Sequence, residues 1–380
     1  MVRVEYSMEK IIAYIIPIIC GLTAANMYYI QPLVPFAQSA LQIGYEQTSM
    51  LYSFSLAGNA LSLLFLVPLG DFYNKKSIII LLYLTSFVAL LVFYFSSYYP
   101  FLAICSMFIG IGTSALPLIT AVFSKRENGH IIIGRIMGGV LLGILASRFV
   151  AGVLCEIWGW KSVYALSAMI TCLCLFILKI IFPDEKQGHK ASYIEILSSN
   201  INTIVMNKVV RFYSITGFSL MFVFSSFWNN ISSYLTSAFH FNGYEIGLFS
   251  LAGVAGASSA YFSNVIFKII PHGNRFLFSG CVISLMIVLF FHYSLAALIL
   301  GTLLVDAFIQ LIHVNNQITM YSLCRGNEAR AASSYMTSFV IGGAVGGYLS
   351  SIVFINFSWT GVIVICILIC FISMTMRLKN

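Results

Sequence analysis

The chain has 380 residues, of which 60% are hydrophobic and only 8% are charged, and its mean hydropathy is +0.95. A water-soluble domain needs a more polar surface, so this composition excludes the soluble classes and predicts an all-α, multi-pass membrane protein. The net charge of +8 follows from basic loops and gives no support to nucleic-acid binding.

Apolar runs of about 20 residues, the length needed to cross about 30 Å of hydrocarbon, recur along the chain. They predict twelve transmembrane helices, at about 11–36, 47–69, 77–97, 100–124, 131–156, 161–182, 209–235, 245–268, 274–293, 295–321, 330–354 and 358–378. No small-residue cleavage site follows the first run, so we expect it to be retained as a span. All Lys and Arg residues except Lys161 and Arg148 fall on one side, which predicts that both termini are cytoplasmic.

The first span carries Asn26 and Tyr29 at helical spacing and continues into Gln31, Pro32 and Pro35. The two prolines predict a bend or an end of the helix near the outer surface. Asn26 can line a cavity or hydrogen-bond a neighbouring helix, and its position alone favours neither.

A charged loop, Pro68-Leu69-Gly70-Asp71-Phe72-Tyr73-Asn74-Lys75-Lys76, joins spans two and three. We expect Asp71 to cap the next helix and to complement its N-terminal dipole, while Lys75 and Lys76 hold the loop on the inner side. A solvated turn would account for the same residues.

Spans four and five combine small and polar residues. Thr113 follows Gly110 and Gly112 in the kinkable fourth span, and Gly139 and Gly143 in the fifth permit close helix contact. Arg148 is the only basic residue well inside a span, and snorkelling to the outer interface would need a reach of about 15 Å. We therefore expect Arg148 to face the protein interior, in a functional role or in a structural ion pair.

The hydrophobicity falls in residues 183–208, which predicts a cytoplasmic linker between two six-span halves, 1–182 and 209–380. A shift that aligns Arg126 with Arg330 also aligns Gly143 with Gly347, which predicts a parallel repeat. The same shift pairs Asp306 with Leu102. The glycines are therefore duplicated but the charges within spans are not, which favours a functional role for the charges.

The second half adds two polar stripes. Asn229 lies with Ser225 and Ser233 on one face of span seven. In span ten, four side chains fall within an arc of about 60° at 100° per residue, and Thr302 extends the stripe to about 22 Å: Asp306, Gln310, His313 and Gln317, with Asn316 beside them. An Asp at the centre of a span costs about 2.5–3.5 kcal/mol, so it should face protein or water. Such a face can hold helices together, but two titratable groups on it favour a transport pathway.

No pattern for an enzyme is present, such as a metal-ligand spacing, a Gly-rich phosphate loop or a nucleophile with a partner base. The nine cysteines are scattered without Cys-x-x-Cys spacing. We therefore expect neither catalysis nor a metal nor another cofactor.

The twelve spans and the charged loop resemble the major facilitator superfamily. Asp71, Lys75 and Lys76 match that family's Gly-x-x-x-Asp-Arg-x-Gly-Arg-Arg signature, whereas Val67, Phe72 and Asn74 depart from it. The chain more closely resembles the bacterial arabinose-efflux and drug:proton antiporter branch, through five motifs: Tyr28-Tyr29-x-Gln31-Pro32-Leu33-x-Pro35, Pro68-Leu69-Gly70-Asp71, Gly143-x-Leu145-Ala146-x-Arg148, Gly159-Trp160 and Asp306-x-x-x-Gln310-x-x-His313-x-x-Asn316-Gln317.

This resemblance implies a monomeric, proton-coupled exporter of a small organic solute in the bacterial inner membrane, working by alternating access. It implies a proton-coupling group of Asp306, His313 and Arg148, and a gating loop of Asp71, Lys75 and Lys76. We expect the substrate to contact the polar residues of the central helices: Asn26, Tyr29, Gln31, Thr113, Asn229, Gln310, Asn316 and Gln317. An importer of an anionic metabolite and a membrane sensor that binds solute without moving it remain alternatives.

Overall fold

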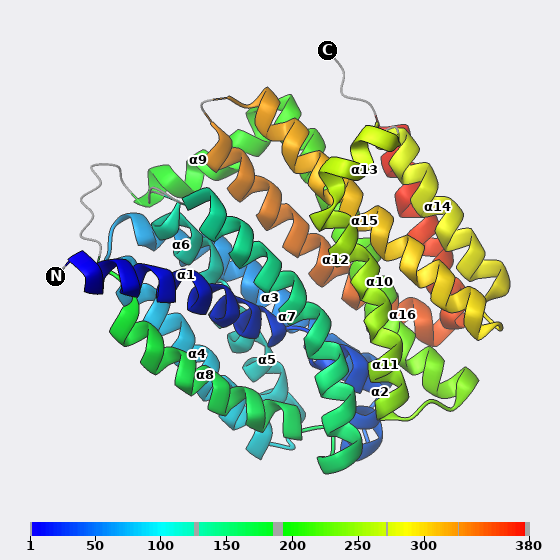
Figure 1. Cartoon of the computed structure of the whole chain (residues 1–380). Coiled ribbons are helices and arrows are strands. Elements are labelled where there is room, and N and C mark those ends of the chain that lie inside the picture. Colours follow the sequence, from blue (N-terminus) through cyan, green and yellow to red (C-terminus); the bar gives the residue numbers. More distant parts are fainter. Residues whose placement is uncertain (1, 125–128, 185–192, 271–272, 326, 377–380) are drawn as a thin grey trace.

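The computed structural model describes residues 2–124, 129–184, 193–270, 273–325 and 327–376, and every element in them is helical (Figure 1). In chain order the elements are α1 (Val2–Ala25), α2 (Ile30–Leu41), α3 (Tyr45–Phe65), η1 (Val67–Asp71), α4 (Lys75–Phe95), α5 (Tyr99–Thr113), α6 (Ala115–Phe123), α7 (Gly129–Trp158), α8 (Ser162–Ile181), α9 (Tyr193–Met206), α10 (Lys208–Phe239), α11 (Gly243–Ser250), η2 (Leu251–Gly253), α12 (Val254–Tyr261), α13 (Ser263–Ile269), α14 (Asn274–Phe291), α15 (Leu295–Leu323) and α16 (Glu328–Thr375).

Within the described ranges, ten helical segments are long and apolar enough to cross a membrane. The segment from Gly243 to Ile269 adds one more span, which is bent by 74° at its break. The 48 residues of α16 contain a break at Ser358, where φ is 55° and ψ is −164°, so α16 supplies two spans. Together these segments give the twelve-helix architecture predicted from the sequence.

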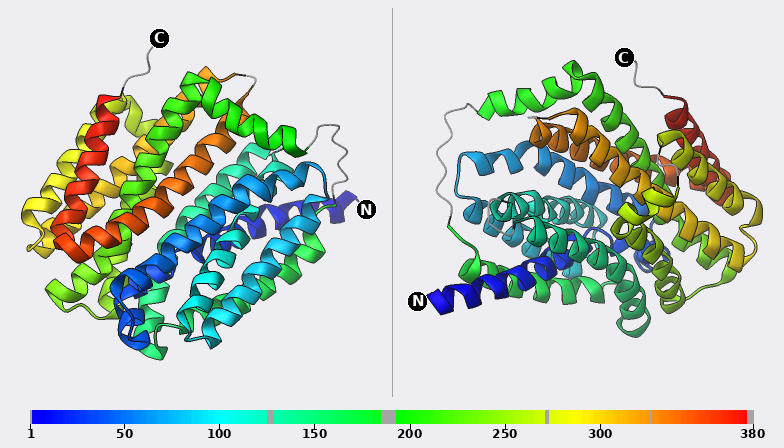
Figure 2. Two further views of the ribbon diagram at one scale, coloured as in Figure 1. Left: turned by 180° about the vertical axis from the view of Figure 1, so that it is seen from behind. Right: turned by 45° about the horizontal axis from the view of Figure 1, so that its top comes forward.

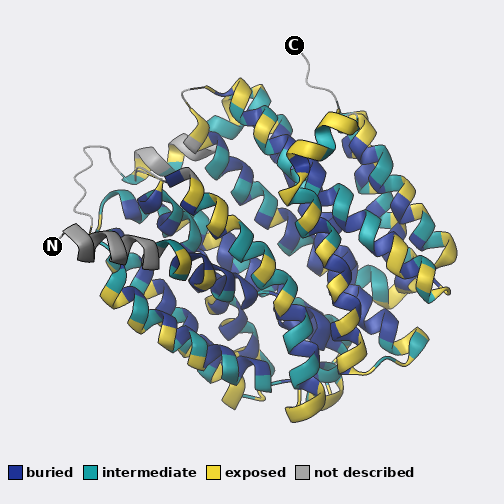
Figure 3. Ribbon diagram, viewed as in Figure 1, coloured by how far each residue is buried: buried dark blue, intermediate teal, exposed yellow. Residues whose placement is uncertain are grey.

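The surface of these helices suits lipid. Figure 3 shows exposed residues along the outer sides of the helices and buried residues where helices face one another. Many exposed side chains are large and apolar, such as Phe95, Ile180 and Phe290. In water such a surface would be unfavourable, whereas hydrocarbon accepts it.

The first span breaks earlier than predicted. The helix stops at Ala25 and resumes at Ile30, and α2 then continues past both prolines to Leu41. Pro32 has no N–H with which to bond the carbonyl of Tyr28, and Gln31 N bonds that carbonyl instead, at 3.2 Å. The predicted bend is therefore present, but it lies before the prolines and not at the outer end.

The helices form two groups, α1 to α8 and α10 to α16, and α9 lies between them in the chain (Figure 2). The groups contact each other mainly through α3 with α16, α7 with α11 and α2 with α10. These contacts lie at the end of the molecule away from α9 and from both termini, as the position of α2 and α11 in Figure 1 shows. The basic residues predict that this end faces outward, although Lys125, Arg126, Lys186, Lys190, Arg377 and Lys379 lie outside the described residues.

We call this contact region the outer seal and define it by three pairs of residues. The rings of Tyr45 and Phe354 lie 4.8 Å apart between centroids. The Ser232 hydroxyl donates to the carbonyl of Gln31 at 2.7 Å. At the third pair, Gly152 and Gly247, a Cβ built on Gly152 would lie 2.8 Å from the Cα of Gly247, so the two backbones approach as closely as glycine permits.

Candidate functional site

Arg148 occupies the interior of the molecule, as predicted. Its side chain projects from α7 and is only 2% exposed. The guanidinium Nε donates to Oε1 of Gln31 at 2.9 Å, and the guanidinium carbon lies 4.0 Å from the ring centroid of Trp228. Phe224 and Tyr28 present rings at 5.2 and 5.6 Å, so three aromatic rings surround the cation.

Asp306 is also buried, with 4% of its surface exposed, and belongs to α15 in the other half. Its Oδ1 accepts a hydrogen bond from Nε1 of Trp228 at 3.2 Å. No salt bridge joins Asp306 to Arg148 directly in the described part of the chain. The indole of Trp228 connects them, since its face contacts the cation and its N–H contacts the carboxylate.

The broken eighth span makes room for both charges. A Cβ built on Gly256 would lie 2.1 Å from Oδ2 of Asp306 and 3.0 Å from Cγ of Gln310. A Cβ on Gly253 would lie 3.4 Å from Nη1 of Arg148. The glycine side of η2 and α12 therefore packs directly against the two charged groups.

Two donors at the centre of this arrangement have no partner among the described residues. They are Nη2 of Arg148 and Nε2 of Gln31, and both side chains are almost fully buried. Leaving a buried donor unpaired costs about 1–3 kcal/mol. These atoms are therefore candidates for contact with a bound solute.

The predicted polar stripe of α15 divides into two groups. Asp306 and Gln310 face α12, as described above. His313 instead lies 2.9 Å from the hydroxyl of Tyr335 in α16, and Nε2 of Gln317 lies 3.1 Å from Nε2 of His313. The second group is held by neighbouring helices of the same half.

Other predicted substrate contacts connect helices. Asn26 Oδ1 accepts from Ser167 at 2.5 Å, and Thr113 accepts from Asn59 at 2.9 Å. Tyr29 packs edge-on against Tyr164 within the first half, and Asn316 donates to Thr216 within the second. These four side chains already have protein partners away from Arg148.

Asn229 lies in the outer seal. Its Nδ2 is within 3.4 Å of the carbonyls of Ser49 and Gly347 and of the Ser351 hydroxyl. Because Ser49 belongs to α3 and Gly347 to α16, Asn229 contacts both halves of the molecule. Its position fits a role in closing the seal.

Comparison with known proteins identifies this arrangement. A family model described as the Major Facilitator Superfamily matches residues 18–325. The chain belongs to the Major Facilitator Superfamily. Such proteins are transporters and not enzymes, in agreement with the prediction from the sequence.

Two relatives cover nearly the whole chain. The uncharacterized transporter YgaY of Escherichia coli O157:H7 is 28% identical over 379 residues, covering 95% of this chain and 93% of its own. The inner membrane transport protein YnfM of Escherichia coli K12 is 24% identical over 347 residues, and the match covers 90% of this chain and 83% of YnfM.

Solved structures share the fold. A bacterial homologue of the human lysosomal transporter Spinster, in an inward-facing and unoccupied conformation, superposes with a TM-score of 0.73 at 14% identity, covering 91% of this chain and 81% of its own. The nucleoside transporter NupG gives a TM-score of 0.76 at 12% identity, and the match covers 94% of this chain and 98% of NupG. At these identities the likeness shows the fold alone.

The loop that resembles the superfamily signature differs from the prediction in one respect. Asp71 ends η1 and does not cap α4, so that expectation is wrong. The cap is Asn74, whose side chain accepts from the backbone N–H of Lys76 at 3.0 Å. Asp71 is the last residue of the 3₁₀ helix η1, which begins at Val67, and α4 starts only at Lys75, so Asp71 lies too early in the chain to cap it.

The same loop contacts the first residues of the linker. Lys76 forms an ion pair with Asp184 at 3.5 Å, and Asn74 donates to Asp184 at 3.0 Å. The hydrogen bond from Asn74, followed by the charge of Lys76, lowers the pKa of the Asp184 carboxyl. Lys75 is buried, with its side chain near Gly70.

Sequence reasoning missed the aromatic residues around Arg148. Trp228 and Phe224 are four residues apart on α10, and Tyr28 lies in the break between α1 and α2. The available signal was the combination of an aromatic pair at helical spacing with an isolated Arg in another span. Gly253 and Gly256 carried a similar signal, since two glycines three apart in a span suggest a close neighbour.

Proposed function

We propose that the protein is a proton-coupled secondary active transporter of a small organic solute, with Asp306 as the proton-binding group. The observation that carries this proposal is the connection of Asp306 and Arg148 through Trp228. The two charges come from different halves of the molecule, at the level where the halves meet. His313 is the second candidate for the proton, although Tyr335 and Gln317 hold it within one half.

Protonation of Asp306 would change how strongly the halves attract each other. The charged carboxylate is attracted to Arg148 across the interface, whereas the neutral acid is not. A ligand that binds two conformations unequally shifts their populations, and a proton is such a ligand. Alternating access between the outer seal and an opposite gate would follow, with Asp71, Lys75, Lys76 and Asp184 acting at the linker side.

The proton gradient can supply the required energy. One pH unit provides about 1.4 kcal/mol per proton, and 100 mV adds about 2.3 kcal/mol per charge moved. One proton could therefore sustain a concentration gradient of at least about a hundredfold.

The direction of transport depends on the charge of the solute. The resemblance to the efflux branch favours export by antiport, in which solute and proton compete. Import of an anion together with a proton is the second candidate, and a specific observation favours it: Arg148 is buried and no carboxylate contacts it directly in the described residues. No feature of the structure favours the sensor alternative.

The cellular context is proposed from the same sources. The basic residues and the inner-membrane relative support a multi-pass protein of the bacterial cytoplasmic membrane, with both termini inside. We propose that residues 1–182 and 209–380 move against each other as two bundles within one monomer, joined by the 183–208 linker.

Proteoliposomes with an imposed pH gradient test the proposal. Adding a transported solute should move protons across the membrane, and the sign of the pH change inside distinguishes symport from antiport. A sensor would bind the solute without moving either species. Solute flux that does not respond to the pH gradient would contradict proton coupling.

A further inference from the structure

Among the residues that the structure describes, no anionic group contacts Arg148 directly. Its guanidinium is enclosed by aromatic rings, and the nearest carboxylate, Asp306, lies beyond the indole of Trp228. A buried cation is stable when an anion pairs with it, and a charge within a span usually marks a substrate or ion pathway. An anionic solute would supply the missing partner.

The geometry of the free donors suits a carboxylate. Gln31 Oε1 already accepts from Arg148 Nε, and these two side chains also carry Nη2 of Arg148 and Nε2 of Gln31, which find no acceptor in the described part of the chain. A carboxylate has two oxygens that accept hydrogen bonds in parallel, and arginine is well suited to such paired contacts. A single acid group could therefore bind both donors.

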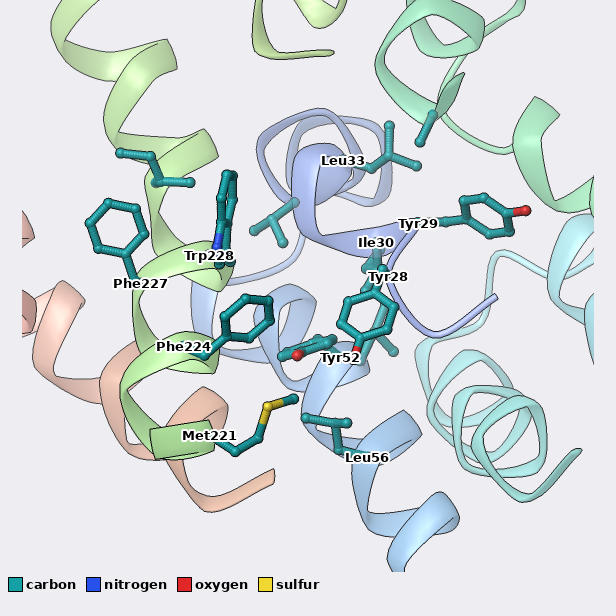
Figure 4. Packing of buried hydrophobic residues seen from close by; sticks show 14 of the residues in the cluster. Tyr28, Tyr29, Ile30, Leu33, Tyr52, Leu56, Met221, Phe224, Phe227 and Trp228 are labelled. Atoms are coloured by element: carbon teal, nitrogen blue, oxygen red, sulfur yellow. The ribbon is translucent and has the colours of Figure 1, made fainter. Parts of the chain in front are cut away.

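The surroundings of the donors suit an apolar, flat molecular body. Figure 4 shows Tyr28, Tyr52 and Phe224 facing one another, with Leu56 and Met221 beside them. The Tyr28 and Tyr52 rings are 6.1 Å apart, and the Tyr52 hydroxyl is already paired with Ser225 at 3.2 Å. An aromatic ring would pack there by edge or offset contacts.

We propose that this site binds a small aromatic monocarboxylate, with its acid group on Arg148 and Gln31 and its ring among Tyr28, Tyr52 and Phe224. The inference deepens the proposed function, on which it rests, by naming the substrate class. It also specifies that proton and substrate move across the membrane in the same direction.

The coupling follows from the charges that face Arg148 in the described residues. These are the titratable groups of Tyr28, Tyr52 and Asp306, and Arg148 is the one charged group that faces Asp306 in turn. Tyrosines stay neutral at ordinary pH, so Asp306, a carboxyl whose burial favours the neutral form, is the group among these that can gain or lose a charge. An anion binds more tightly when Asp306 is protonated, because the neutral acid no longer offsets the charge of Arg148. Proton and substrate therefore bind together and move in the same direction.

Binding to purified protein in nanodiscs, without any gradient, tests the inference. The probes are benzoate and 3-phenylpropanoate, their uncharged amides, and hexanoate as an aliphatic acid. We expect at least one aromatic acid to bind at least about tenfold more tightly than its amide and than hexanoate, since an unpaired buried Arg discriminates strongly. Binding of that acid at pH 6 should be roughly tenfold tighter than at pH 8, within the usual range of coupling between two sites.

Three variants make the test specific. Arg148→Gln should abolish acid binding, whereas Arg135→Gln, on the same helix but exposed and stacked on Tyr14, should leave it unchanged. Gln31→Glu places a carboxylate beside Arg148, so it should raise the melting temperature and block the acid. A merely structural Gln31 would not give both effects, and this variant remains informative if Arg148→Gln does not fold.

Binding of neither aromatic acid, equal binding of acid and amide, or equal binding of hexanoate would overturn the inference. Acid binding that survives in Gln31→Glu would do the same. Asp306→Asn separates this inference from the proposed function, because it should bind the acid tightly at both pH values whether or not Asp306 carries the transported proton. A transporter that moves protons with another solute but does not bind these acids would retain the proposed function and lose only the substrate class.

Discussion

At the scale of single residues, Trp228 is the side chain that contacts both buried charges. Its indole contacts Arg148 with the ring face and Asp306 with the N–H, at 4.0 and 3.2 Å. In the proposed function, protonation of Asp306 would therefore affect Arg148 through the indole, without a direct ion pair. A tryptophan is suited to this role because it combines a large ring with one donor.

Replacing Trp228 by Phe separates these two contacts. Trp228→Phe keeps a ring beside Arg148 but removes the donor to Asp306. A hydrogen bond to a charged group contributes about 1.5–3 kcal/mol, and its loss disfavours the charged carboxylate, so the pH midpoint of transport should rise by about one unit or more. Flux measured from pH 5 to 9 checks this.

The matched control is Trp158→Phe, since Trp158 is exposed at the end of α7. An unchanged pH profile in Trp228→Phe would show that the indole N–H has no part in coupling.

The sequence predicted the burial of Arg148 and Asp306 because a charged side chain within an apolar span avoids lipid and faces the protein interior or a water-filled cavity. It did not predict Trp228, because an aromatic residue in an apolar helix gives no signal by itself and its partner Arg148 lies in a distant part of the chain. Asn26 and Thr113 were predicted as substrate contacts, but polar residues also join helices. In the structure both have protein partners within their own half.

At the scale of elements, the breaks in helices place the site. The interruption at residues 26–29 brings Tyr28 and Gln31 toward Arg148, and the broken span of η2 and α12 presents glycines to both charges. Proline marked the first break approximately, because the affected carbonyl lies four residues before the ring. The second break and the Asn74 cap depend on local hydrogen bonding that residue patterns left open.

Gly256 should tolerate no side chain. In Gly256→Ala the new methyl group would overlap Oδ2 of Asp306, whereas in Gly253→Ala it would make ordinary contact with Nη1 of Arg148. We expect Gly256→Ala to lower stability by about 1–3 kcal/mol and to reduce transport, and Gly253→Ala to change both much less.

Thermal unfolding and flux of both variants check this, with Gly134→Ala as a control at a glycine that has open space around it. Equal effects of the substitutions at Gly253 and Gly256 would contradict the assigned packing.

The contact of Asp184 with Asn74 and Lys76 should depend on pH. Because the pKa of Asp184 is lowered in the folded protein, its stabilising contribution is present above the ordinary Asp value of about 3.9 and is lost as the pH falls through the folded value. Wild type should therefore melt slightly above Asp184→Asn at pH 7, and the difference should vanish in strong acid. A difference that grows on acidification would refute this assignment.

At the scale of the whole molecule, the described contacts between the halves gather at the outer seal. Glu156 of α7 accepts from the backbone N–H of Gly243 at the start of α11, at 3.1 Å, and so connects the halves there. A carboxylate near a helix N-terminus contributes about 0.3–1 kcal/mol. This hydrogen bond therefore contributes little to the seal, and a conformational change can break it at small cost.

Glu156→Gln should weaken the seal and increase the population of the state open at that end by about two- to fivefold. Spin-label distances between the ends of α7 and α11 would measure the shift. The control is Glu245→Gln, because Glu245 bonds the N-cap residue of its own helix and does not connect the halves. An identical distance distribution in Glu156→Gln and wild type would show that Glu156 does not hold α7 and α11 together.

Topology is the remaining prediction at this scale. The positive residues predict that the linker lies inside, so reporter fusions at Lys190 and Phe241 should report opposite sides of the membrane. Reports from the same side would contradict the assignment of the outer seal. The fold itself followed well from the sequence, because the length of the hydrophobic runs determines the spans.

The central claim is that Asp306 carries the coupled proton, and transport by Asp306→Asn in proteoliposomes tests it most directly. Asparagine resembles the protonated acid and cannot release a proton. The variant should exchange substrate down its gradient at a rate comparable to that of wild type, but it should fail to concentrate substrate when a pH gradient is imposed. Accumulation against a gradient with the pH dependence of wild type would contradict the claim.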